Sequence, residues 1–146
     1  MHILVLNGPN LNLLGVREPE HYGTQTYADL VKMIQDEAQT LGITVECRQT
    51  NHEGVLVDWI QEARGTADGI VINPAAYTHT SVAILDAVKA VQIPTVEVHI
   101  SDPDTRDAFR QISYIRAACI GTVKGMGLAG YCIALHDLKT YLDAQN

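Results

Sequence analysis

Hydrophobic and polar positions follow two alternating periodicities along the chain. Apolar residues recur at helical spacing over 27–41, 55–63, 81–91 and 128–142. Short apolar runs, typical of buried strands, cover 3–6, 43–47, 69–72, 95–98 and 118–123. A short helix should begin near Asp104 and carry Phe109. Thr26 and Asp29 have the spacing of a capping box at the start of the first long helix, and Gly42 can end that helix.

Regular alternation of strand and helix favours one α/β architecture. Right-handed crossovers between successive parallel strands give a flavodoxin-like, doubly wound, five-stranded parallel sheet. We expect residues 1–146 to form a single catalytic domain. The longest irregular stretch is 11–25, and a loop of that length in a compact domain is often a lid or a binding loop.

Polar residues gather directly after four of the expected strands. Ligands of such sheets bind beyond the carboxyl ends of the strands, so these residues should form one site. They are Asn7, Asn10, Asn12, Arg17 and Tyr22; Asn51, His52 and Glu53; Asn73, Tyr77, Thr78 and His79; and His99, Ser101, Arg106 and Arg110.

Composition and charge narrow the possible partners. The net charge of −7 disfavours nucleic acid and anionic membranes, although locally concentrated arginines could still bind a small anion. No apolar run approaches the roughly 20 residues of a membrane helix, and the N-terminus lacks a basic leader. The three cysteines have no CxxC spacing, which favours buried thiols in a reducing cytoplasm.

Two motifs have competing explanations. Residues 125–130 match GxGxxG, but a dinucleotide site would need a further βα unit and an acidic residue about 20 positions on, so a tight turn is favoured. A flavodoxin-like module that binds a nucleotide or flavin is the alternative function. His79 and His99 could supply two metal ligands, but no nearby set completes a site, so we expect no metal.

Several of these residues suit proton abstraction beside a ketone. A guanidinium stabilises a phenolate, so Arg17 could make Tyr22, in the same loop, a usable base. Asn10, or a water that it holds, could stabilise the resulting oxyanion. Glu97 and His99 share one face of a strand, so Glu97 could orient the imidazole. The intact set of Arg17, Tyr22 and His99 argues against a catalytically silent scaffold.

The motifs resemble those of the type II dehydroquinate dehydratases over essentially the whole chain. The matching blocks are LNGPNLNLLG at 6–15, REPEHYG at 17–23, NPAAYTHTS at 73–81, EVHIS at 97–101, Phe109-Arg110, and GMGLAGY at 125–131. Two positions depart from the family pattern. Asp102 stands where an asparagine is usual, and Gln111-Ile112 stands where polar or histidine residues are usual.

The resemblance implies a lyase that converts 3-dehydroquinate to 3-dehydroshikimate by trans elimination through an enolate, without a cofactor. It implies that Tyr22 is the base and that Arg17 keeps it ionised. His99 would protonate the departing hydroxyl with support from Glu97, and Asn10 would position a water at the enolate. The same reaction serves aromatic biosynthesis and quinate breakdown.

The resemblance also implies substrate-binding residues and an assembly. Asn73, His79, Arg110 and the backbone at Ile100 and Ser101 would bind the carboxylate and hydroxyls, and Asp86 would reach a neighbour's site in a dodecamer of trimers. The sequence itself favours an oligomer, because 82–91 and 128–135 are apolar on most sides and a second subunit could cover them.

Overall fold

The computed structural model, which describes residues 1–20 and 23–146 with their side chains, contains the predicted five-stranded parallel sheet. The strand order is β2-β1-β3-β4-β5, which is the flavodoxin-like order, and neighbouring strands are all parallel. The strands are β1 (His2–Asn7), β2 (Thr44–Gln49), β3 (Gly69–Asn73), β4 (Thr95–His99) and β5 (Gly121–Lys124). The predicted fold class is confirmed.

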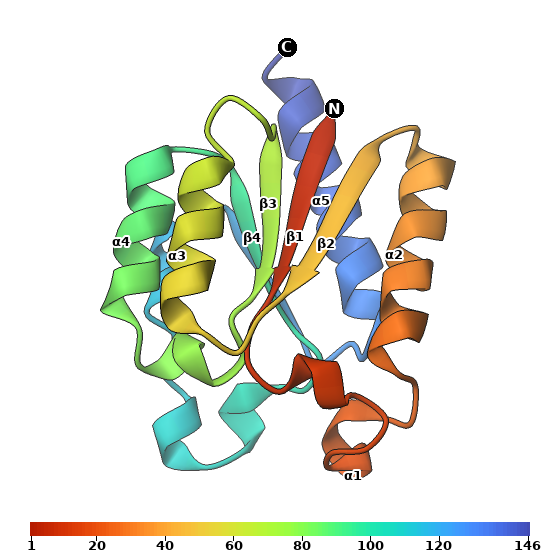
Figure 1. Ribbon diagram of the computed structural model, residues 1–146, viewed down its shortest axis with the longest axis vertical. Helices are drawn as coiled ribbons and strands as arrows, with labels where there is room; N and C mark the ends of the chain where they lie inside the picture. Colours follow the sequence, from red (N-terminus) through yellow and green to blue (C-terminus); the bar gives the residue numbers. More distant parts are fainter.

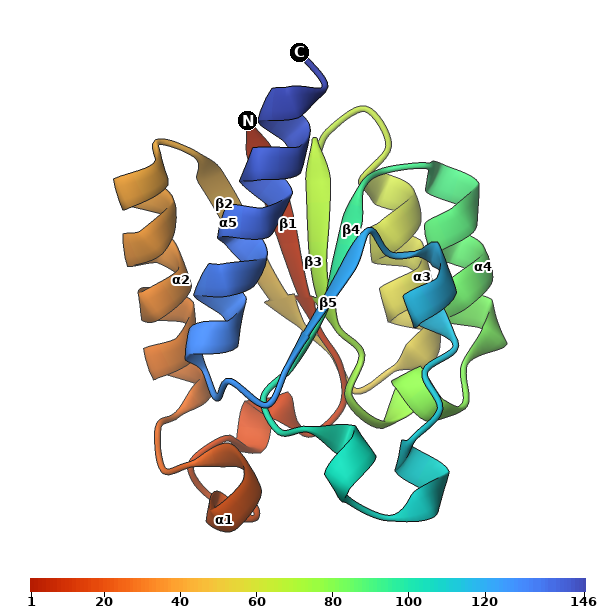
Figure 2. The same cartoon turned by 180° about the vertical axis from the view of Figure 1, so that it is seen from behind.

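Four long helices cover the two faces of the sheet. α2 (Tyr27–Leu41) and α5 (Ala129–Ala144) lie on one face, and α3 (Glu53–Glu62) and α4 (Val82–Val91) lie on the other (Figures 1 and 2). Both views place α1 (Pro19–Tyr22) and the segment that follows β4 at the carboxyl end of the sheet, opposite the two termini. These two connections therefore meet where a ligand site is expected.

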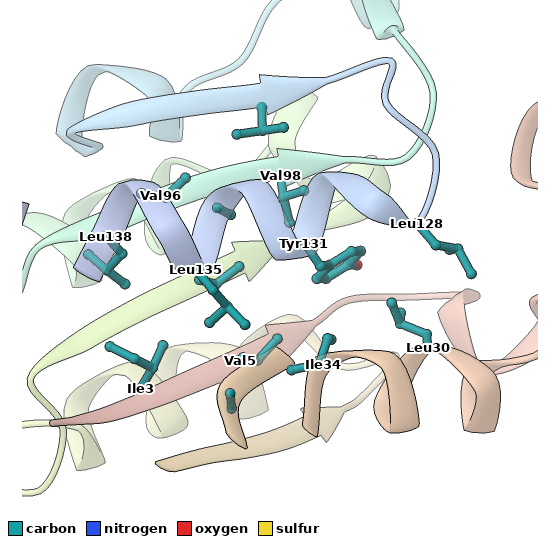
Figure 3. Packing of buried hydrophobic residues seen from close by; sticks show 14 of the residues in the cluster. Ile3, Val5, Leu30, Ile34, Val96, Val98, Leu128, Tyr131, Leu135 and Leu138 are labelled. Carbon is teal, nitrogen blue, oxygen red and sulfur yellow. The ribbon is translucent and has the colours of Figure 1, made fainter. Parts of the chain in front are cut away.

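The buried core is divided between the two faces by the period-two alternation of the strands. Ile3 and Val5 of β1 pack with residues of α2 and α5, as Figure 3 shows, whereas Leu4 and Leu6 pack toward α3 and α4. Every residue of β3 and β4 is buried, because helices cover both sides of these central strands.

The start of α2 confirms the predicted capping box. The Thr26 hydroxyl accepts a hydrogen bond from the Asp29 backbone N–H at 3.2 Å, and the Asp29 carboxylate accepts one from the Thr26 N–H at 2.9 Å. Gly42, with φ of 69°, ends the helix in the left-handed conformation.

The segment between β4 and β5 differs from the prediction. In place of one short helix near Asp104 it contains three 3-10 turns, η3 (Pro103–Thr105), η4 (Ala108–Arg110) and η5 (Ile115–Ala118), and β5 begins at Gly121 rather than at 118. Phe109, which the predicted helix was to carry, lies in η4 and is 66% exposed. An isolated helix this short is not stable without an apolar face packed against the core, so the chain forms single turns.

Two smaller expectations are wrong. Cys47, Cys119 and Cys132 are half-buried rather than buried. The apolar perimeter of α5 does not require a second subunit, because α2, β3, β4 and β5 pack around it within the chain. Within the described part of the chain, no helix has the length and apolar character needed to cross a membrane.

Candidate active site

A pocket lies at the carboxyl ends of the strands, the edge at which sheets of this topology bind ligands. Its walls come from the loops after β1, β3 and β4, which the parallel topology brings to one edge. The lining residues are Pro9, Asn10, Leu11, Arg17, Asn73, Ala75, Ala76, His79, His99, Ile100, Ser101, Pro103, Arg106 and Arg110.

A close approach of two loops shapes the floor of this pocket. The Gly8 N–H donates to the Asn73 carbonyl at 2.8 Å, and a Cβ at position 8 would lie 2.5 Å from the Pro74 carbonyl oxygen. Only glycine fits there. Asn10 follows with φ of 70°, and its backbone N–H donates to the Asn51 side chain at 3.0 Å. The loop after β1 is thus tied to the ends of β2 and β3.

The pocket is electropositive although the chain is acidic. Arg17, Arg106 and Arg110 all line it, and no acidic residue is among the described residues of its lining. Glu18 lies beside the mouth, with its carboxylate 3.2 Å from Nη2 of Arg17 and 3.8 Å from Nη2 of Arg106. Three guanidinium groups around one small hollow are suited to an anionic ligand.

His99 is held from behind by a fully buried carboxylate. Its Nε2 lies 2.5 Å from Oε2 of Glu97, which leaves Nδ1 as the ring nitrogen available to the pocket. Burial raises the pKa of Glu97, but hydrogen bonds from His99, Ser113 and Thr78 outweigh it and bring the pKa to about 2. The ionised carboxylate therefore fixes the orientation of the imidazole.

His79, unlike His99, offers the pocket a hydrogen-bond acceptor. Its Nδ1 donates to the Ile112 carbonyl at 2.7 Å, so Nε2 is left as an acceptor in the neutral ring. Burial lowers the pKa of His79, partly offset by this hydrogen bond. A neutral His79 can accept a hydrogen bond from a ligand hydroxyl.

Asn73 is fixed by a buried hydrogen-bond chain. Its Oδ1 accepts from the Ala75 N–H at 3.0 Å, and its Nδ2 donates to the Tyr131 hydroxyl at 2.9 Å. The Tyr131 hydroxyl in turn donates to Oδ1 of Asn7 at 2.6 Å. Burial raises the pKa of Tyr131, so the phenol stays neutral and serves as a fixed donor and acceptor.

The glycine-rich turn at 125–130 supports the pocket from outside. Gly125 and Gly127, with φ of 75° and 62°, donate backbone N–H groups to the carbonyls of Ser101 and Ile100 at 3.1 and 3.0 Å. Gly130 packs against Val98 and Val123. The motif is a tight turn that positions the Ile100–Ser101 backbone, as the sequence favours.

Most of the predicted site residues meet in this pocket. Those that line it are Asn10, Arg17, Asn73, His79, His99, Ile100, Ser101 and Arg110, and Glu97 lies directly behind His99. Asp86 does not line it, because it is exposed on α4. His52, which precedes α3, is also exposed and lies outside the lining. The predicted base, Tyr22, lies outside the described residues.

Sequence reasoning missed the groups that surround Glu97. Ser113, Arg116 and Thr122 come from the turns and the strand after β4, and their side chains reach the carboxylate at 2.7, 3.2 and 3.3 Å. Thr78 reaches it at 2.9 Å. Buried carboxylates need several donors, so the position of Glu97 within an apolar strand was the one available signal.

Metal ligation has no obvious site in this pocket. Among the described residues, no group of three His, Cys, Asp or Glu side chains could hold a metal ion. The expectation that the site works without a metal stays a prediction.

The sheet and the pocket together define an α/β protein with an imidazole–carboxylate pair at a pocket lined by three arginines. The family model "Dehydroquinase class II" matches residues 1–139. Proteins named 3-dehydroquinate dehydratase from Dinoroseobacter shibae and Phenylobacterium zucineum are 53% and 56% identical to this chain. The alignments cover 99% and 91% of this chain, and 96% and 92% of those proteins. The chain belongs to the class II dehydroquinase family.

Solved structures agree with this assignment. The type II dehydroquinase of Butyrivibrio crossotus superposes with a TM-score of 0.94 at 51% identity, covering 95% of this chain and 97% of that one. The type II dehydroquinase of Propionibacterium acnes gives a TM-score of 0.92 at 46% identity, covering 95% and 96%.

Proposed function

We propose that this protein catalyses the dehydration of 3-dehydroquinate to 3-dehydroshikimate. One observation carries the proposal: the imidazole of His99, backed by buried Glu97, shares one pocket with three arginines. The substrate is a small carboxylate, so the arginines match its charge, and the elimination needs an acid for the leaving hydroxyl.

Proton removal is assigned to Tyr22 in its phenolate form. The phenolate takes the proton beside the ketone, and the electron pair of the broken C–H bond moves to the ketone oxygen as an enolate. Arg17, which lines the pocket from the same loop, stabilises the phenolate. Asn10 lies in the lining and would hold a water that donates to the enolate oxygen.

Loss of water is assigned to His99. The enolate collapses to the conjugated ketone, the C–O bond breaks, and the proton on Nδ1 of His99 passes to the departing hydroxyl. Glu97 keeps the ring oriented for this transfer through the bond to Nε2. After product release, Tyr22 loses the proton that it took and His99 regains the proton that it gave. Both groups return to their starting states, so the cycle needs no cofactor.

Binding of the carboxylate and hydroxyls is assigned to the rest of the pocket. Arg110, Asn73 and the backbone at Ile100 and Ser101 would hold the carboxylate and one hydroxyl, and neutral His79 would accept from another hydroxyl. The tight turn after β5 and the Tyr131 hydroxyl fix these donors before the substrate arrives. Preorganised donors lose little entropy on binding.

The assembly and the location are part of the same proposal. We propose a dodecamer built from trimers, in which residues 1–146 act as one catalytic domain and Asp86 of a neighbouring subunit completes the site. The exposure of Asp86 on α4, beside half-exposed Leu85 and exposed Val82, supports a contact at this face. Three unpaired cysteines suit a reducing cytoplasm. The reaction serves aromatic biosynthesis or quinate breakdown.

An absorbance assay tests the proposal. Purified protein, mixed with 3-dehydroquinate after removal of metals with a chelator, should produce the ultraviolet absorbance of a conjugated ketone at an undiminished rate. A protein that leaves the substrate unchanged, or that carries bound flavin or nucleotide, would favour the alternative of a flavodoxin-like binding module.

A further inference from the structure

A charged contact behind the pocket takes no part in the mechanism above. Arg116 lies on η5, outside the pocket lining, and its Nε is 3.2 Å from Oε1 of Glu97. The side chain is 36% exposed, whereas Glu97 is fully buried. The contact therefore brings a cation from the surface to the inner carboxylate that supports His99.

The two oxygens of Glu97 have different partners. Oε2 accepts from Nε2 of His99 at 2.5 Å and from the hydroxyls of Ser113 and Thr78 at 2.7 and 2.9 Å. Oε1 accepts from Arg116 and from the Thr122 hydroxyl at 3.2 and 3.3 Å. One oxygen thus faces the acid, and the other faces a permanent positive charge.

This division matters because the charge of His99 changes during turnover. When the protonated ring gives up its proton, the buried Glu97 carboxylate loses its charged neighbour. A buried carboxylate without a compensating charge is costly. A guanidinium is charged at every working pH, so Arg116 continues to compensate Glu97 after the proton has left.

We infer that Arg116 is a positioning residue for the acid step, which compensates the charge of Glu97 and thereby eases proton donation by His99. The inference rests on the proposed function. It follows that a positive charge at position 116 should oppose the protonated form of His99, since both cations share one carboxylate.

Other charged or titratable groups face the same cluster. His79 and Asp104 interact electrostatically with His99, Cys119 with Glu97, and Asp104 and Lys124 with Arg116. Arg110 and His79 both line the pocket and interact electrostatically. A substitution at position 116 leaves all of these groups in place, so a difference between variants reports the charge of Arg116.

The test compares Arg116→Gln, which keeps an N–H donor without charge, with Arg116→Lys, which keeps the charge. Nuclear magnetic resonance of the histidine rings follows the titration midpoint of His99. In Arg116→Gln the midpoint should rise by about one pH unit, and in Arg116→Lys it should stay near that of the wild type. Arg64→Gln, an exposed arginine just after α3, is the matched control and should change nothing.

Kinetics supply the second readout. Arg116→Gln should lower kcat on the order of tenfold, the typical cost of losing a group behind a reacting one, with KM little changed. Arg116→Lys should restore most of kcat. An unchanged midpoint in Arg116→Gln would overturn the inference, as would equal losses of kcat in both variants with a parallel fall in Tm. If Arg116→Gln shifts the midpoint of His99 but the wild type does not turn over 3-dehydroquinate, only the proposed function is refuted.

Discussion

The ionisation of Glu97 is the residue-scale feature with the largest energetic consequence. The carboxylate is fully buried, yet it accepts hydrogen bonds from His99, Thr78, Ser113, Arg116 and Thr122. Donors in this number favour the charged form over the neutral form despite the burial. Its pKa falls from 4.5 to about 2, so the folded protein holds the charge more firmly than the unfolded chain does.

This depressed pKa predicts an acid-sensitive contribution to stability. A group whose pKa is lower in the folded state contributes fully above its unfolded pKa and loses that contribution as the pH falls through the folded pKa. For Glu97 the contribution is about 3 kcal/mol above pH 4.5, lost between pH 4.5 and about 2.

Denaturant unfolding at fixed protein concentration, repeated across this window, measures the effect. As the pH is lowered through this window, the free energy of unfolding of the wild type should fall more steeply than that of Glu97→Gln. Asp58→Asn, at an exposed position on α3, should keep the wild-type slope. Equal slopes in the wild type and in Glu97→Gln would mean that Glu97 is not held ionised.

The residues that line the pocket could be predicted from the sequence, but the residues that hydrogen-bond to Glu97 behind His99 could not. Asn73, His79 and His99 directly follow or end strands, so topology alone places them at one edge. Arg116 and Ser113 sit in irregular turns with no periodicity, and their distance from Glu97 depends on how those turns fold. No local pattern encodes such a contact.

At the scale of elements, the close approach of the β1 and β3 ends is the feature that most constrains the site. Asn7 and Asn73 are register partners at the last rung of the ladder, and both join the hydrogen-bond chain through Tyr131. Directly after them Gly8 lies against Pro74, with no room for a side chain. The segments that carry Asn10 and His79 begin at this point.

Gly8→Ala should therefore destabilise the protein and disturb the pocket. The added Cβ would lie 2.5 Å from the Pro74 carbonyl oxygen, so the backbone must shift, at a cost of about 1–3 kcal/mol. Thermal and denaturant unfolding measure the loss. Gly54→Ala in α3, where a Cβ meets nothing within 4 Å, should be neutral or slightly stabilising. Wild-type stability in Gly8→Ala would show that the two strand ends can separate freely.

Element identity follows from periodicity wherever an element packs on the sheet. The helices at 27–41 and 81–91 were predictable because burial on one face imposes their apolar spacing, and the strands were predictable as short apolar runs, continuous where helices cover both sides of the sheet. The segment 103–118 was not, since its conformation is set by Pro103, by the Asp102 side chain bound to the Asp104 N–H at 3.0 Å, and by Asp104 paired with Lys124. These contacts are specific to the folded chain.

At the scale of the whole molecule, the outer face of α4 is a surface on which a single chain leaves apolar side chains exposed. Val82 is 51% exposed, Ala83 and Ala90 are exposed, and Asp86 lies among them. α4 buries its opposite face against α3 and η5. This mostly apolar face carries one acid, Asp86, and one base, Lys89, and it suits an interface in which Asp86 meets a cation of a neighbouring subunit.

Subunit mixing should reveal whether Asp86 works in a neighbour's site. Tyr22→Phe and Asp86→Ala should each be inactive alone. Oligomers that contain both subunits should regain activity, because some sites combine an intact Tyr22 with an intact neighbouring Asp86. Activity is followed by product absorbance after exchange of subunits has been verified. Mixed oligomers that stay inactive would exclude a role across the interface.

We propose that this pocket performs acid–base dehydration with Tyr22 as the base. The most direct measurement compares Tyr22→Phe with the wild type for both binding of 3-dehydroquinate by calorimetry and its turnover by absorbance. The variant should bind the substrate nearly as well and turn it over ~10²–10⁴-fold more slowly, the usual contribution of a general base. A variant that keeps more than about a tenth of the wild-type rate would contradict the claim.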